Sequence, residues 1–286
     1  MLSTRATRSP LKLAAGLVVF GAWGTALAAG CELIAGVRTG ELAPGIHAGA
    51  SGGTGGSTTS SGGGPTGGGG SSYAAEVLSD GPIAYWRLGE DTTPTAFDSS
   101  GNGHDGTYQS VTVGVPGAIA GDPDTAAHFD GSGAVDFGDH FGFEGNVPFS
   151  VELWIKPESH SEGFLGKAHY DVATGYSGWF LVENVGPDYP LDFYRVGAVA
   201  GPALPQGTYS YVVGAYDGVN LMLYVDGQMV DQAVDSDPLS VNIGSFVVGA
   251  VDGWGQLGGA IDEVALYDKN LAPSRISAHF HVGTGR

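Results

Sequence analysis

The sequence predicts an all-β domain built as a two-sheet antiparallel sandwich. From residue 83 to residue 267, short runs of alternating apolar and polar residues are separated by Gly, Asp, Asn or Pro. Side chains alternate between the two faces of a strand, so a two-residue period broken at short intervals favours an antiparallel sandwich over a nucleotide-binding α/β domain. The clearest runs are 150–157 (SVELWIKP), 209–218 (YSYVVGAYDG), 220–230 (NLMLYVDGQMV) and 259–268 (GAIDEVALYD).

The first of these runs has the pattern of a strand inside a sandwich. Val151, Leu153 and Ile155 fall on one face of the strand, whereas Trp154 and its charged neighbours fall on the other. Trp154 and Trp86 both lie inside strand patterns, so we expect them to pack within the domain rather than to bind a ligand.

The connections between the runs fit the same architecture. Asp226-Gly227 lies between two runs and has the sequence of a hairpin turn. The one helix that we expect is short and lies near the end of the chain, at 272–280 (APSRISAHF).

The first 30 residues have the layout of a secretory signal peptide. Three basic residues precede an apolar run at 13–29, and small residues then lead to Cys31, the single cysteine. A transmembrane helix is the rival interpretation, but the run is short for one and is interrupted by glycine.

The cysteine itself suggests a lipid anchor. The segment ALAAGC, which ends at Cys31, resembles the lipobox of bacterial lipoproteins, whose cysteine becomes the lipidated N-terminus. Leu27 stands one position earlier than the usual leucine, and Ala28 takes that leucine's place. We therefore expect lipidation of Cys31 and a membrane anchor, and the alternative is cleavage near Ala29 with a free thiol.

A spacer and one domain are expected to follow. Residues 31–72 form the predicted tether, since 49–72 consist of Gly, Ser and Thr with one Pro, a composition typical of flexible coil. Those 24 residues would span roughly 25–30 Å as a random coil. Residues 73–286 are enough for a single sandwich with its own core.

The charge of the chain excludes one class of partner. It has 11 Lys and Arg against 30 Asp and Glu, a net charge of −19. Such an acidic protein is not expected to bind nucleic acid electrostatically. The acid excess fits solubility outside the cell, turn residues beside glycine, or ligands for a divalent cation.

Six segments, in order over residues 80–280, carry a resemblance to a known family. The domain resembles the LamG-like jelly rolls of the concanavalin A-like lectin/glucanase superfamily, which implies a two-sheet antiparallel jelly roll over residues 73–286. The segments are 84–90 (AYWRLGE), 97–108 (FDSSGNGHDGTY), 126–139 (AAHFDGSGAVDFGD), 148–157 (PFSVELWIKP), 223–230 (LYVDGQMV) and 258–276 (GGAIDEVALYDKNLAPSRI).

The resemblance also implies a calcium ion, because members of the family often hold one. It points to Asp98 and Asn102, in the segment after the first strand, and to Asp262 in the last strand, with Asp130 as a looser candidate. The alternative is that the segment around Asp98 is a glycine-rich turn whose side chains bind their own backbone.

Four aromatic residues are candidates for stacking on sugar rings. Trp254 lies between two glycines, where no strand pattern explains so large a side chain, and is the best candidate. Tyr189, Tyr170 and Tyr176 also lie in segments that the pattern predicts to be loops. Trp179, by contrast, lies in a strand-like run and is expected in the core.

No catalytic motif is apparent. Glucanases of this superfamily carry Glu-x-Asp-x-x-Glu on one strand, and this spacing does not occur here. Asp262 and Glu263 are adjacent, so in a regular strand they face opposite sides. We therefore expect no enzymatic activity.

Together these observations predict an exported protein of the cell envelope or outer surface, held by an N-terminal lipid anchor. Its expected function is non-catalytic recognition of a carbohydrate or a glycoprotein, with calcium assisting. The alternatives are a protein–protein adhesion or assembly module without sugar specificity, and a glycoside hydrolase with an unfamiliar site.

Overall fold

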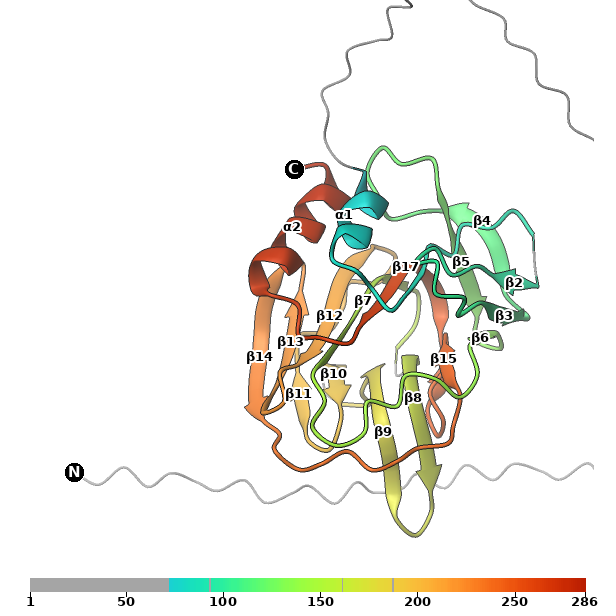
Figure 1. Ribbon diagram of the computed structural model, residues 1–286. Helices are drawn as coiled ribbons and strands as arrows, with labels where there is room; N and C mark the ends of the chain where they lie inside the picture. The colour runs from blue at the N-terminus through green and yellow to red at the C-terminus, as the bar shows by residue number, and fades with distance from the viewer. Residues whose placement is uncertain (1–71, 93, 161, 187) are drawn as a thin grey trace, which may run out of the picture. The chain divides into compact units, whose positions relative to one another are not determined.

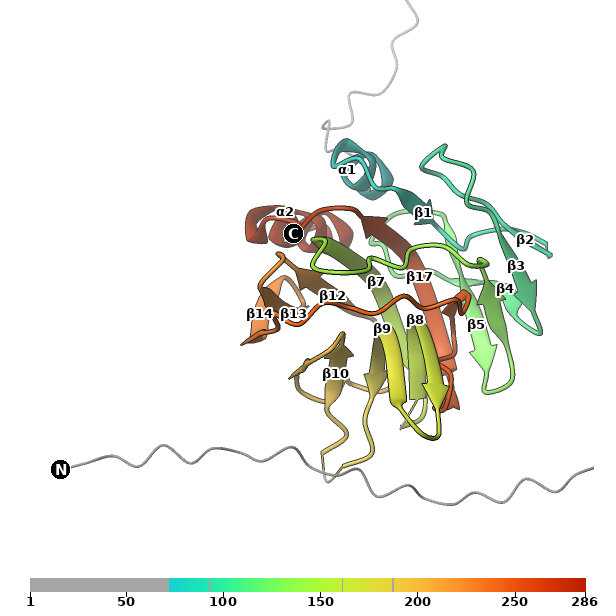
Figure 2. The ribbon, with the colours of Figure 1, turned by 60° about the horizontal axis from the view of Figure 1, so that its bottom comes forward.

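The computed structural model describes residues 72–92, 94–160, 162–186 and 188–286. They form the predicted jelly-roll sandwich of two sheets, with two helices added (Figures 1 and 2). The predicted signal peptide, Cys31 and nearly all of the predicted tether lie outside the described residues. In the described part of the chain, no helix has the length and apolar character needed to cross a membrane.

One sheet, called sheet A here, has eight strands, all paired antiparallel. In spatial order they are β14 (Gln228–Val234), β13 (Asn220–Val225), β12 (Ser210–Tyr216), β7 (Phe149–Pro157), β17 (Gly258–Tyr267), β5 (Thr125–Asp130) and β4 (Thr112–Pro116), with β1 (Ala84–Trp86) also paired to β17.

The other sheet, called sheet B, has nine strands. In spatial order they are β11 (Ala198–Ala200), β10 (Leu191–Tyr194), β9 (Gly175–Glu183), β8 (Glu162–Asp171), β15 (Phe246–Val248), β6 (Ala134–Asp136), β3 (Gly106–Gln109) and β2 (Thr95–Ala96), with β16 (Gly255–Gln256) paired in parallel to β8. The long hairpin of β8 and β9 extends beyond its neighbours at the bottom of Figure 1.

The main core lies between the two sheets. Val151, Leu153 and Ile155 of β7 point into it, which confirms the face predicted from the sequence. Trp179 and Leu181 of β9 meet them from sheet B, and all five side chains are fully buried. The predicted hairpin is also confirmed, because Asp226 and Gly227 join β13 to β14.

The outer face of sheet A is covered by two helices, α1 (Tyr73–Ser79) and α2 (Pro273–Thr284). Tyr73 and Phe280 pack on Trp154 with ring centroids about 6 Å away, at 6.2 and 6.1 Å respectively, so Trp154 is a packing residue as predicted. The sequence predicts α2 at 272–280, so α2 is confirmed and extends four residues further than predicted, whereas α1 was not predicted. Both helices lie on the sheet A side in Figure 2, so the outer face of sheet B is free of them.

Candidate functional site

Five aromatic residues lie close together on the outer face of sheet B and are called the aromatic strip here. Neighbouring ring centroids are 4.8 Å apart for Tyr170 and Tyr176, 5.1 Å for Tyr176 and Phe180, and 4.8 Å for Phe180 and Tyr194. Trp254 joins the strip from the side, with its ring centroid 6.3 Å from that of Tyr176. Tyr170 is 37% exposed, whereas Phe180 is buried at 1%.

Strand register explains why these rings meet. Tyr176 on β9 is directly opposite Tyr170 on β8, and Phe180 on β9 is opposite Tyr194 on β10. Because side chains alternate along β9, these residues point outward while Trp179 between them points into the core. The strip therefore crosses three adjacent strands on one face.

A glycine allows the loop that carries Trp254 to approach the strip. Gly253 has a φ of 78°, and a Cβ atom there would lie 2.6 Å from the hydroxyl of Tyr176 and 3.2 Å from Cβ of Tyr170. Any larger residue would have to displace one of these tyrosines. The indole nitrogen of Trp254 is buried and has no hydrogen-bond partner among the described residues.

One end of the strip is polar. The Asn184 side chain donates to Asp192 Oδ2 at 2.8 Å, and the Tyr194 hydroxyl donates to the same oxygen at 2.9 Å. Burial raises the pKa of Asp192, although these two hydrogen bonds oppose the shift. Asp192 is 6% exposed, and its other oxygen, Oδ1, lacks a hydrogen-bond partner in the described ranges.

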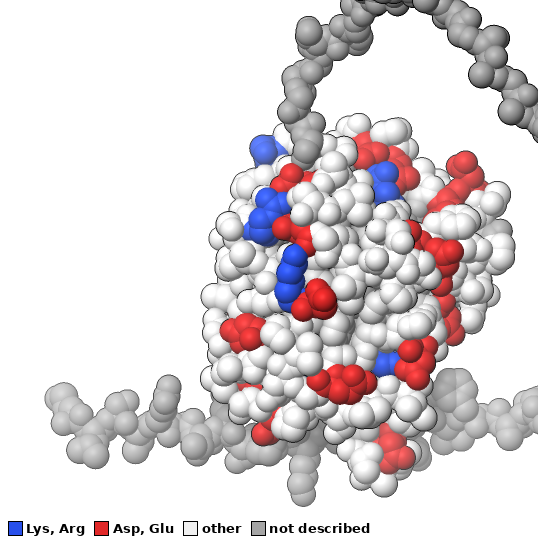
Figure 3. All heavy atoms as spheres, viewed as in Figure 1, with Lys and Arg blue, Asp and Glu red and all other residues white. Residues whose placement is uncertain are grey.

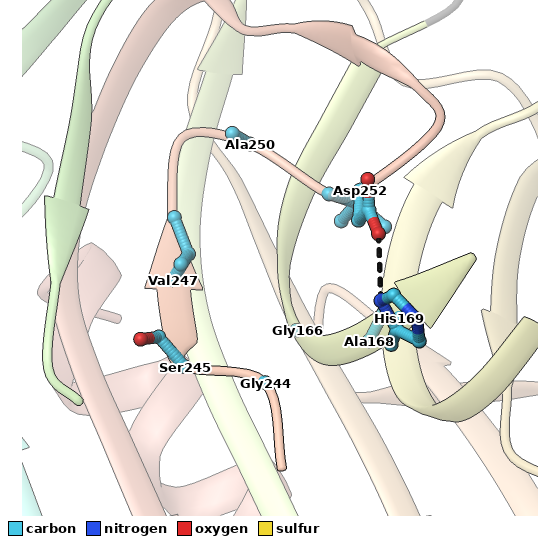
Figure 4. Close-up of a pocket in the computed structure, with 9 residues that line it drawn as sticks. Gly166, Ala168, His169, Gly244, Ser245, Val247, Ala250 and Asp252 are labelled. Carbon is cyan, nitrogen blue, oxygen red and sulfur yellow. Dashed lines mark ion pairs between the residues drawn. The ribbon is translucent and has the colours of Figure 1, made fainter. Parts of the chain in front are cut away.

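Beside the strip lies a hollow of about 330 Å³ (Figure 4). Small residues of β8, Gly166 and Ala168, contribute to its lining. At its rim His169 and Asp252 point toward each other, with His169 Nδ1 3.2 Å from Asp252 Oδ2. The backbone N–H of Tyr170 donates to the same carboxylate oxygen at 2.9 Å, so the hollow and the strip share Asp252 as a boundary.

Three of the four aromatic candidates from the sequence are thus brought together, and the fourth is not. Tyr189 instead stacks on the ring of His160, with centroids 4.1 Å apart and planes 7° from parallel. His160 Nδ1 lies 2.9 Å from the buried carboxylate of Glu183. Tyr189 makes no ring contact with the strip among the described residues.

The structure gives Asp98 a role in holding the backbone. Its Oδ1 accepts hydrogen bonds from the N–H groups of Tyr85 at 3.0 Å and Ser100 at 2.9 Å, and its Oδ2 accepts one from His104 at 3.0 Å. Although burial alone would raise the pKa of Asp98, these hydrogen bonds outweigh it and hold the pKa below the ordinary value. This arrangement matches the turn alternative stated above.

Asn102 and Asp130 also bind their own surroundings. The Asn102 side chain donates to the carbonyls of Pro82 at 3.3 Å and Ile83 at 3.0 Å, which ties the turn to the start of β1. Asp130 is exposed and accepts hydrogen bonds from the backbone and hydroxyl of Ser132. Within the described ranges no three carboxylate, imidazole or thiol groups converge as metal ligands, so the calcium roles stay predictions.

Asp262 has different surroundings, because it lies in a buried acidic cluster. Its Oδ2 accepts a hydrogen bond from the N–H of Ala118 at 2.7 Å, and its buried Oδ1 has no hydrogen-bond partner among the described residues. Arg87 Nη2 is the nearby cation, 2.9 Å from Glu263 and 2.8 Å from Asp124. Burial raises the pKa of Asp262 well above its ordinary value, and the charge of Glu263 raises it further.

A β-bulge brings Asp262 and Glu263 into this one cluster. The register of β17 shifts between Asp262 and Ala265, and Glu263 takes a left-handed backbone conformation with a φ of 55°. The extra residue of a bulge redirects side chains, so the strict alternation expected from the sequence does not hold here.

The sequence analysis missed several residues of this face. Phe180 and Tyr194 lie in strand patterns, which gave no reason to separate them from the core. The hydrogen bond between Asn184 and Asp192 exists because β9 pairs with β10, and this pairing is not visible in the sequence. The one available signal was the alternation of apolar and polar residues at 191–194.

Solved structures with this fold include parts of carbohydrate-active proteins. Domain 4 of AbnA, a GH43 extracellular arabinanase from Geobacillus stearothermophilus in complex with arabinotriose, matches with a TM-score of 0.50 and 22% identity. The match covers 69% of this chain and 97% of that domain. A Trypanosoma rangeli sialidase in complex with sialic acid matches with a TM-score of 0.55 and 15% identity, over 71% of this chain and 33% of the sialidase. No curated protein sequence matches this chain.

The fold is thus a two-sheet jelly roll with a partly exposed aromatic strip on one outer face. A family model described as the concanavalin A-like lectin/glucanases superfamily matches residues 129–277, more than half of the chain. The chain belongs to this superfamily, which confirms the resemblance drawn from the sequence.

The same comparisons correct one expectation. The missing Glu-x-Asp-x-x-Glu strand led us to expect that the chain is not an enzyme. That expectation was wrong, because solved structures similar to this chain include an arabinanase domain and sialidases. One absent motif does not separate this chain from the enzymes that share its fold.

Proposed function

We propose that this domain recognises carbohydrate on the outer face of sheet B, with sugar rings stacking on the aromatic strip. The observation that carries the proposal is the juxtaposition of partly exposed rings with a buried polar group at one end and a hollow at the other. A sugar has apolar C–H faces that fit aromatic rings and hydroxyl groups that need fixed polar partners.

The polar partners are suited to hydroxyl groups. Asp192 Oδ1 is a carboxylate oxygen without a hydrogen-bond partner among the described residues, and such a group gains free energy from any donor that reaches it. The Asp252 carboxylate at the rim of the hollow is a second acceptor. The names of the similar structures support the proposal, since they are complexes with arabinotriose and with sialic acid.

Calcium is proposed to stabilise the domain from the cluster around Asp262. Calcium prefers carboxylate and carbonyl oxygens. The support from the structure is Asp262, whose Oδ1 is buried without a hydrogen-bond partner among the described residues, next to the three carboxylates that pair with Arg87. Asp262 would supply one carboxylate ligand to the ion, which would neutralise charge that Arg87 leaves uncompensated. Asp98, Asn102 and Asp130 have other partners and are not included.

The recognition domain is further proposed to be displayed on the cell envelope by a lipid on Cys31. The support for this part is the sequence alone. A lipid at Cys31 followed by a glycine-rich spacer would let a recognition domain reach ligands beyond the membrane surface.

A glycan array tests the function. The full-length chain and a Trp254→Ala variant are applied with calcium and with EDTA, and Phe97→Ala serves as the matched control because Phe97 is exposed but is not part of the strip. We expect the unaltered chain to bind glycans. Trp254→Ala should abolish this binding while the variant stays folded, and Phe97→Ala should leave the binding intact. Binding that survives Trp254→Ala, or no binding in either buffer, would overturn the proposal and favour protein adhesion.

A further inference from the structure

We infer that the outer face of sheet B selects glycans that carry protonated amino groups and rejects glycans that carry carboxylates or sulfates. The inference rests on the proposed function, because it concerns the charge of the ligand at the same site. It follows from two observations: carboxylates lie beside the aromatic strip, and the basic side chains of the domain make their contacts away from it.

The basic side chains of the domain make their contacts away from the aromatic strip. Among the described residues there are seven Lys and Arg, and six of them contact carboxylates, backbone carbonyls or rings away from the strip. Arg286, the last residue, follows α2 on the sheet A side. The six are Arg87, Lys156, Lys167, Arg195, Lys269 and Arg275.

Two of these residues start from sheet B, yet both turn away from its outer face. Lys167 belongs to β8, but its side chain is buried and contacts Asp139 and the carbonyl of Gly244. Arg195 follows β10, and its side chain is buried against Asp235, 3.3 Å away, and the ring of Tyr216. A carboxylate or sulfate on the strip would therefore meet no guanidinium or ammonium group of the described residues.

Carboxylates, by contrast, flank the strip. The Asp252 side chain is 50% exposed beside Tyr170. Figure 3 shows the same imbalance on another face, where red acidic side chains are widespread and blue basic ones are few.

Asp192 adds a second carboxylate at the opposite end of the strip. It lies on the outer face, since it is opposite Val182, whose side chain packs with Phe180 in the same cluster. Its unpartnered oxygen is an acceptor inside the site itself, and an ammonium group would supply both a hydrogen bond and a compensating charge.

Among the described residues, His169 is the basic side chain at this rim. Its Nδ1 lies 3.2 Å from Asp252 Oδ2, so any positive charge on the ring faces a carboxylate already. It therefore does not provide the uncommitted cation that an acidic glycan would require.

The aromatic rings favour the same ligand. A cation close to the face of a tyrosine or tryptophan ring is attracted by the ring's quadrupole. An amino sugar stacked on Tyr170 and Tyr176 would place its ammonium group within reach of both ring faces and Asp252. A sugar with a carboxylate would face repulsion at the same positions.

Three oligosaccharides of equal length test the inference with the full-length chain: a glucosamine tetramer, an N-acetylglucosamine tetramer and a galacturonic acid tetramer. Measured by calorimetry at low salt, the glucosamine tetramer should bind about tenfold more tightly than the acetylated one, the combined effect of an exposed ion pair and a cation–π contact. The galacturonic acid tetramer should not bind. Raising the salt concentration should remove most of the tenfold preference.

An isosteric pair of variants assigns the preference to the site. Asp252→Asn should abolish the preference, whereas Asp130→Asn, which removes an exposed carboxylate from a turn outside the strip, should leave it unchanged. Failure of the glucosamine tetramer to bind, equal binding of both hexosamine tetramers, or binding of the galacturonic acid tetramer would each overturn the inference. The proposed function would survive these results if the array still showed binding that depends on Trp254.

Discussion

The imidazole of His279 lies 2.9 Å from the carboxylate of Glu152, and both side chains are completely buried. His279 belongs to α2 and Glu152 to β7, so the pair fixes the helix to sheet A. The other ring nitrogen of His279 lies 2.9 Å from Asp80, the residue that caps α1. Tyr211 and Tyr267 donate hydroxyl hydrogen bonds to Glu152, which completes the partners of a buried charge.

Removing His279 should destabilise the domain strongly. His279→Gln leaves the Glu152 carboxylate buried without its cation, and the loss of one partner of a buried ion pair costs roughly 3–5 kcal/mol. Urea denaturation followed by tryptophan fluorescence measures the change. His281→Gln is the control, since His281 is exposed on the same helix and its loss should change the unfolding free energy by less than about 0.5 kcal/mol.

The same pair predicts how stability depends on pH. Although burial alone would lower the pKa of His279, the carboxylates of Glu152 and Asp80 raise it above its ordinary value. The folded state therefore binds this proton more tightly than the unfolded state does, so the stabilisation is complete below about pH 6.5 and is lost as pH rises through the folded pKa. The unfolding free energy should therefore decrease as pH rises above about 6.5. If a His279→Gln variant showed the same decrease, His279 would not be the residue responsible for it.

Calcium should stabilise the domain more at high pH than at low pH. Burial raises the pKa of Glu263 to about 7, so without calcium the stability falls as pH rises from about 4, where these carboxyls ionise in the unfolded chain, through about 7. A bound cation offsets that loss. The difference in melting temperature between calcium and EDTA should be small at pH 5 and largest at pH 8.

Two variants locate the calcium effect. Asp262→Asn should remove the difference at pH 8, and Asp130→Asn should preserve it, because Asp130 is exposed in a separate turn. Equal melting temperatures in calcium and EDTA at pH 8 for the unaltered chain would exclude the ion from this cluster.

A single methyl group at Gly253 should disrupt the aromatic strip. The Cβ of Gly253→Ala would lie 2.6 Å from the Tyr176 hydroxyl and 3.2 Å from Tyr170, so one ring must move and glycan affinity should fall at least tenfold. Gly131→Ala is matched, since its φ is 87° but nothing lies within 4 Å of its Cβ. Both variants should lose about 1–2 kcal/mol from left-handed strain, and only the first should lose binding in a titration with the best glycan.

If Cys31 is lipidated, replacing it should change both the mass of the mature protein and its location in the cell. Cys31→Ser should yield a protein that lacks the mass of the acyl chains and leaves the membrane fraction, as measured by intact mass spectrometry and fractionation. A membrane-bound variant whose mass differs only by the altered side chain would contradict the lipid anchor.

The sandwich itself could be predicted from the sequence because its evidence is local. The alternation in β7 shows which side chains face the core. The Asp226-Gly227 pair shows where the chain reverses direction between β13 and β14. The helix α1 escaped prediction because seven residues are two turns, too few to establish a helical period. Without α1, the burial of Trp154 and Glu152 on the outer face of β7 could not be foreseen in detail.

The candidate site could be predicted only where its residues stand outside strand patterns. Trp254 between two glycines was recognisable on that ground, whereas Phe180 and Tyr194 look like core residues until the uncovered sheet face is known. Tyr189 was predicted for the same reason as Trp254, but its partner is His160. Which aromatic residues share a face depends on strand register, and register links segments that are distant in sequence.

The position of α1 determines the side of the sandwich on which the described polypeptide enters the domain. Ser72 caps α1 on the outer side of sheet A, and the aromatic strip lies on the outer side of sheet B. Two packed sheets about 10 Å apart separate the point where the described polypeptide enters the domain from the aromatic strip. A polymer that stacks on the strip as proposed would therefore dock on the side of the sandwich opposite Ser72.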